Sequence, residues 1–153
     1  MGAYVLRRGK WATDPLRSPS LKAIHAAVRA LDGTTRTVVV LAAAQAGVTM
    51  EVSYGGPDLA VVTLQLEPGR GVILASQNPG LVPVSTRWGA NETVWQPRYG
   101  VGIREALQAV DYFFTHGAGD PALVWEQVNA ESFWQGPTDQ RDGGPGADIE
   151  TAG

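Results

Sequence analysis

Residues 37–44 read TVVVLAAA, and residues 49–54 read TMEVSY after a short connection. The first run is continuously apolar, which is typical of a strand buried on both faces. In the second run every other residue is apolar, which is typical of a strand with one face in the core and one toward solvent. Because only residues 45–47 and one further residue separate the two runs, the pattern predicts an antiparallel hairpin.

The same patterns recur along the chain and predict further strands. Apolar and polar residues alternate over residues 60–67, and turn residues rich in Gly and Pro separate this run from the next ones. Pro97 cannot donate a backbone hydrogen bond, so the strand that ends beside it is expected at an edge. The further predicted strands are 60–67, 71–77, 84–88, 93–96 and 122–128.

Two segments show the spacing of amphipathic helices. Residues 20–31 place apolar side chains three or four positions apart after an expected cap at Ser18 and Pro19, and residues 102–116 carry a wide apolar stripe that ends before Gly117. Gly117 suits the left-handed residue that follows a helix. The predicted fold class is α+β, an antiparallel sheet of five to six strands with two helices packed on one face.

The 153 residues divide into three parts by composition. Residues 1–19 form a basic N-terminal segment, and residues 20–135 form a single α+β domain. Residues 136–153 are rich in Gly and Asp and poor in large apolar side chains, so we expect a disordered tail. The formal net charge of the chain is −3, and the acidic residues of this tail account for it, which leaves the rest balanced and without an overall basic footprint for nucleic acid.

The chain has no cysteine and two histidines. No secretory signal and no long apolar span is recognised, so we expect a cytoplasmic protein. His25 and His116 belong to no metal-ligand or acid–base motif, and residues 99–105 (YGVGIRE) lack the third glycine of a dinucleotide fingerprint. We therefore expect no catalytic residue, no metal and no cofactor. The remaining carboxylates on predicted strands are interpreted as solvent-facing residues.

Five tryptophans are many for a chain of this size. Trp125 lies within an apolar strand and is expected in the core, where a large aromatic surface is buried. Trp88 and Trp95 flank a polar turn beside Pro97, which is a position where aromatic side chains serve as interface anchors as well as core residues. The candidate partner-binding residues are Trp88, Glu92, Trp95, Arg98 and Tyr99.

The segment 109–126 (AVDYFFTHGAGDPALVWE) resembles the signature of the Imm1 family of immunity proteins, found in bacterial polymorphic toxin systems. In that family an amphipathic helix ends in an aromatic residue, a glycine turn and a proline, and a strand with a tryptophan follows. Phe113, Gly117, Pro121 and Trp125 occupy these positions and are expected to have structural roles. The order of the upstream elements is compatible with the family over residues 20–128.

The resemblance implies a protein that is not an enzyme and that neutralises a cognate bacterial toxin, expected to be a nucleic-acid deaminase. It would bind the toxin one-to-one and occlude the active site or the substrate groove, without contacting nucleic acid or a membrane. The neutral body departs from the acidic surface that such inhibitors often present to a basic groove. Two alternatives remain open, a chaperone or adaptor that escorts an effector without inhibiting it, and a small ligand-binding α+β domain.

Overall fold

The computed structural model describes residues 2–7, 10–11, 16–17, 19–43, 47–67, 69–88 and 90–136. All but the first residue of the predicted tail, and most of the turn expected at 45–47, lie outside these ranges. Within them the chain forms two α-helices, one large antiparallel sheet and a separate two-stranded sheet. The predicted α+β class is confirmed.

The large sheet contains six strands of four residues or more, in the order β11-β7-β6-β5-β4-β1. Three two-residue strands extend it, because β2 and β3 pair with β1, and β10 pairs with β6. The strands are β1 (Gly2–Arg7), β2 (Lys10–Trp11), β3 (Leu16–Arg17), β4 (Arg36–Ala42), β5 (Thr49–Gly56), β6 (Leu59–Glu67), β7 (Arg70–Ala75), β10 (Val101–Gly102) and β11 (Val124–Gln127).

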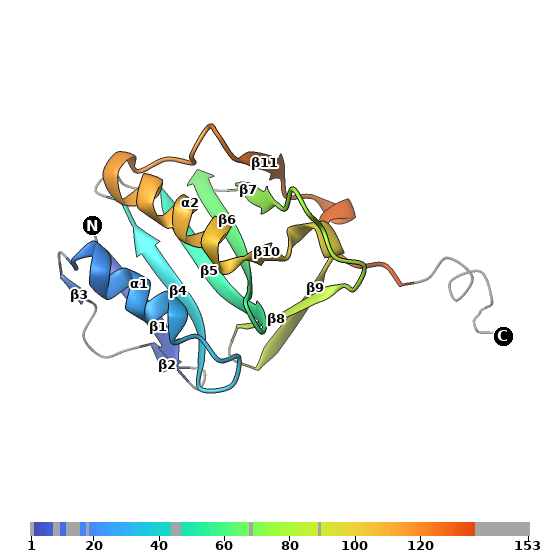
Figure 1. Cartoon of the computed structure of the whole chain (residues 1–153), viewed down its shortest axis with the longest axis horizontal. Helices are drawn as coiled ribbons and strands as arrows, with labels where there is room; N and C mark the ends of the chain where they lie inside the picture. The colour runs from blue at the N-terminus through green and yellow to red at the C-terminus, as the bar shows by residue number, and fades with distance from the viewer. Residues whose placement is uncertain are drawn as a thin grey trace, which may run out of the picture.

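The two helices lie on the same side of this sheet, as Figure 1 shows. Helix α1 (Leu21–Arg29) begins at Ser20, whose hydroxyl accepts a hydrogen bond from the Ala23 N–H at 3.1 Å, and not at the Ser18 and Pro19 pair expected from the sequence. Helix α2 (Ile103–His116) ends where predicted. Gly117 has φ +66°, and its N–H donates to the Phe113 carbonyl at 2.7 Å.

The main core lies between the helices and the sheet. The inward stripes of α1 and α2 contact alternate residues of the central strands, which is the arrangement that helical and strand periodicities produce when they share one face. Its fully buried members include Ile24, Val28, Val39, Leu41, Met50, Val52, Val62, Ala106, Val110 and Phe113.

The second sheet, β8 (Val84–Trp88) with β9 (Asn91–Trp95), packs on the opposite face. The sequence pattern predicts both strands as members of the main sheet, but the loop through Pro79 and Pro83 carries the chain to the other face. Val84 of β8 can approach the backbone of the main sheet and of the 3-10 turn η1 (Pro97–Tyr99) closely because two glycines face it. An added Cβ would lie 2.8 Å from a Val84 methyl group at Gly55 and 2.6 Å from one at Gly100. This sheet therefore closes a small second core.

The loop between α1 and β4 is organised by the carboxylate of Asp32. Its Oδ1 accepts the N–H groups of Thr34, Thr35 and Arg36 at 2.9 to 3.0 Å, and its Oδ2 accepts the Thr35 hydroxyl. The backbone hydrogen bond from Arg36, with those from Thr35 and Thr34, holds the pKa of Asp32 well below its usual range.

We expect Asp32→Ala to lower the melting temperature at pH 7, with Asp32→Asn intermediate. Since the folded pKa is depressed, the stabilising contribution is fully present above the unfolded pKa of about 4 and is lost as the pH falls below it. Thermal unfolding of both variants from pH 7 to pH 2 measures this. A gap between parent and Asp32→Ala that stays constant down to pH 2 would contradict the assignment.

Candidate functional site

Glu126 on β11 gathers two of the predicted partner-binding residues. The Tyr99 hydroxyl donates to Glu126 Oε1 at 2.7 Å, and the Arg98 Nε donates to the same oxygen at 3.1 Å. The Arg98 guanidinium lies 4.6 Å from the centre of the Tyr99 ring. Both belong to the 3-10 turn η1 (Pro97–Tyr99), which is tied to the end of β7 because the Ser76 N–H donates to the Arg98 carbonyl at 2.7 Å.

These contacts shift the ionisation of the cluster. The hydrogen bond from Tyr99 is the main cause that lowers the pKa of Glu126, and burial raises the pKa of Tyr99. The carboxylate therefore stays charged at neutral pH and the phenol stays a donor. Tyr99 is almost completely buried, so it supports the surface from beneath and offers no exposed ring to a partner.

Trp95 is also held within the molecule. Its ring stacks on Phe133 with centroids 4.9 Å apart and meets the edge of Tyr99 at 6.5 Å. Its indole N–H donates to the hydroxyl of the buried Thr86 at 2.9 Å. The free edge that was predicted for β9 is partly covered by residues 133 and 134. Trp95 forms a β-bridge with Phe133, and the Trp134 N–H donates to the Val94 carbonyl.

Trp88 and Glu92 lie outward at the far end of the same hairpin. Trp88 is 40% exposed, and Glu92, also exposed, accepts the Ser85 hydroxyl and faces Arg87 across the β8–β9 ladder. The structure thus separates the five candidates. Trp95, Arg98 and Tyr99 join a cluster with Glu126, whereas Trp88 and Glu92 remain at the surface.

Exposed large apolar side chains concentrate around this hairpin. Leu81 and Val82, in the loop that leads into β8, are 95% and 74% exposed, and Trp134 beside β9 is 37% exposed. We call these three residues together with Trp88 the hairpin surface. Leu81, Val82 and Trp134 were not among the predicted contact residues, although two aliphatic residues between Gly80 and Pro83 are a usable signal of an exposed apolar loop tip.

The residues of the family-like motif have structural positions. Phe113 is fully buried, and Gly117 supplies the left-handed turn after α2. The Trp125 ring is partly buried against the main core, and its N–H donates to the Asp120 carbonyl at 3.0 Å. Pro121 lies in the turn between them.

Two further features of titratable side chains were not predicted from the sequence. His25 on α1 contacts the carboxylate of Asp111 on α2, although 86 positions separate them. Burial raises the pKa of Glu51 on β5. Among the described residues no group of three or more His, Cys, Asp or Glu side chains is placed to hold a metal ion. None of the helices within these residues is long and apolar enough to cross a lipid bilayer.

Comparison with known protein families found no matching family model, and no curated protein matched the sequence. The resemblance described above therefore depends on the residues quoted for it.

The Glu126 cluster gives a direct prediction. We expect Glu126→Gln to lower the free energy of unfolding at pH 7 by about 1 kcal/mol, because a charged acceptor of two hydrogen bonds becomes neutral at a partly exposed site. Tyr99→Phe removes one of the donors and is the matched variant. Since the pKa of Glu126 is depressed, its contribution is present above the unfolded value and declines as the pH falls through the folded one. Urea unfolding at pH 7 and pH 3 should show the difference between parent and Glu126→Gln shrinking at the lower pH.

Proposed function

We propose that this protein is an immunity protein that binds a cognate bacterial toxin and neutralises it by occlusion, with a nucleic-acid deaminase as the expected toxin. The observation that supports it most is the hairpin surface. Exposed large apolar side chains along one hairpin of a small domain, at both of its ends, are a feature of protein-binding surfaces. The motif at Phe113, Gly117, Pro121 and Trp125 supports the family assignment of this proposal.

The construction of the hairpin suits a rigid inhibitor. The Trp95 and Phe133 stack, with Tyr99 and Glu126 beneath it, fixes β9 to the body. Fixing a surface before binding reduces the entropy lost on association. At the turn end of the hairpin, Trp88 lies next to the charged pair Arg87 and Glu92. This combination resembles the apolar centre and charged rim of a typical interface.

The test is co-expression with the product of the gene immediately upstream, which this proposal identifies as the toxin. We expect growth to be rescued, a one-to-one complex by light scattering, and loss of toxin activity on its nucleic-acid substrate at equimolar protein. Full toxin activity in the presence of excess protein would overturn the proposal. A stable complex whose toxin remains active would indicate an adaptor instead.

A further inference from the structure

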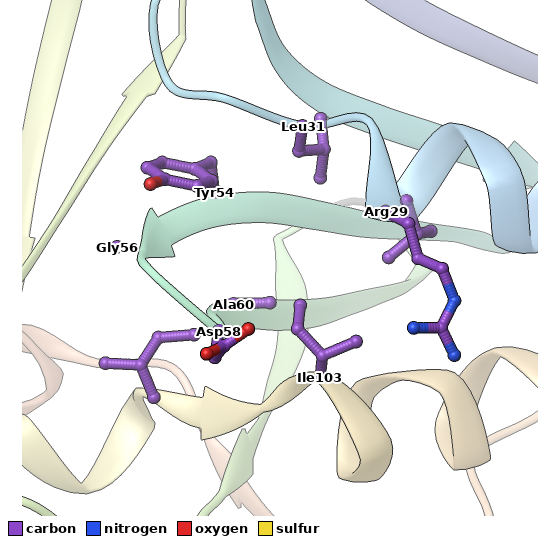
Figure 2. A pocket seen from close by; sticks show the side chains of 9 residues that line it. Arg29, Leu31, Tyr54, Gly56, Asp58, Ala60 and Ile103 are labelled. Atoms are coloured by element: carbon purple, nitrogen blue, oxygen red, sulfur yellow. The ribbon is translucent and has the colours of Figure 1, made fainter.

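A second surface feature lies away from the Glu126 cluster, where three elements meet. The end of α1, the beginning of α2 and the β5–β6 turn enclose a pocket of about 280 Å³, shown in Figure 2. Its lining includes the aliphatic residues Val28, Leu31, Leu59 and Ile103 and the charged residues Arg29 and Asp58. Its volume is just below the range of about 300 to 1,000 Å³ for small-molecule sites, which suits one large side chain better than a cofactor.

The lining combines aliphatic side chains at the centre of the pocket with two side chains of opposite charge. In Figure 2 Ile103 lies between the guanidinium of Arg29 and the carboxylate of Asp58. The structure pairs neither charge with another described side chain, and both residues are exposed. An apolar centre with unpaired charges at its border is the arrangement found where a partner inserts an anchoring side chain.

The border of the pocket is fixed by its backbone. Asp58 has φ +59°, and it is the one non-glycine residue with positive φ in the described ranges. Its carbonyl accepts the N–H of Ile103 at 3.1 Å, which ties the turn to the beginning of α2. The border of the pocket is therefore held in one backbone conformation by the beginning of α2.

The pocket and the hairpin surface are connected through β5. The end of β5 contacts Val84 at the beginning of β8 through Gly55, and β8 packs against β4 and β5. The pocket on the helix side and β8 on the opposite face are therefore both adjacent to the end of β5.

We propose that this pocket receives an aliphatic anchor side chain of the bound toxin, with a basic residue of the toxin beside Asp58 and an acidic residue beside Arg29. This inference depends on the proposed function, because it assigns a contact to the same partner. Charge complementarity at the border orients the anchor, and the centre supplies the apolar contact.

The test compares affinities for the upstream-encoded toxin domain by titration calorimetry. Leu59→Trp places a much larger side chain at the pocket, and we expect it to weaken binding by about 30-fold. Arg29→Gln and Asp58→Asn each remove one charge, and we expect losses of about 5- to 10-fold from each; asparagine also tolerates the left-handed conformation. The matched controls are Val124→Trp, at an exposed apolar residue of β11, and Lys22→Gln, two turns from Arg29 on the same helix. Both are expected to bind within about 2-fold of the parent.

Melting temperatures identify any variant that fails to fold, and the two charge variants provide the test if Leu59→Trp is one of them. If the parent binds and the three pocket variants bind as tightly as the controls, the pocket inference is wrong and the proposed function stands. If the parent itself does not bind the toxin domain, the proposed function falls and the pocket inference falls with it.

Discussion

Trp125→Ala is expected to lower the free energy of unfolding by about 3 to 5 kcal/mol, the largest loss that we predict for a single substitution. The ring packs against the main core, and its N–H is satisfied by the Asp120 carbonyl. It also fills the space over Gly119, where an added Cβ would lie 3.0 Å from both the Trp125 ring and Leu64. Truncation removes this contact and leaves the Asp120 carbonyl without that donor.

Chemical denaturation monitored by far-UV circular dichroism measures the loss, since the fluorescence of the deleted tryptophan would complicate the signal. Trp125→Phe is the control, because it keeps most of the apolar contact and removes the N–H, so it should lose clearly less than the alanine variant. A loss below about 1 kcal/mol for Trp125→Ala would show that the turn after α2 repacks without the ring.

Trp95→Ala is expected to destabilise the protein by about 3 kcal/mol. The substitution removes the stack on Phe133, the edge contact with Tyr99 and the donor to the buried Thr86 hydroxyl. The stack joins β9 to Phe133, which is distant in sequence, and the hydrogen bond joins it to its partner strand β8, so their loss also loosens the hairpin surface. Toxin binding should weaken together with stability, because the surface is no longer held in one conformation.

Trp88→Ala is the matched comparison at the other end of the hairpin. Its ring is two-fifths exposed, so we expect a smaller change in the melting temperature and a loss of toxin affinity of about 2 kcal/mol. Parallel melting curves and titrations of both variants separate support of the surface from contact with the partner. Equal loss of stability from the two substitutions would contradict this division.

The elements of the central fold were predictable from the sequence because their signals are local. The apolar stripe of α2, its end at Gly117 and the alternation in β5 and β6 all arise from neighbours within a few residues. Such periodicity also indicates which face is buried, and the core follows once the helices and the sheet share that face.

The arrangement of the candidate surfaces was not predictable in the same way. The packing of β8 and β9 on the opposite face requires Val84 to lie directly against Gly55 and Gly100. No local sequence pattern encodes this contact. Likewise the Glu126 oxygen that binds Tyr99 and Arg98 lies 27 and 28 positions away from them. A list of aromatic and charged residues near Pro97 therefore located the cluster but left open which members are buried.

The N-terminal residues were assigned no strand by the sequence analysis, yet β1 pairs with β4 along most of its length. Strand β4 reads RTVVVLA and is one of the most apolar segments of the chain. An uncovered edge of this kind offers a row of free backbone groups to any other chain. By pairing with β4, β1 covers this apolar edge, and the short strands β2 and β3 cover part of the edge of β1 in turn, so loss of the first residues is expected to leave the backbone groups of β4 open to another chain.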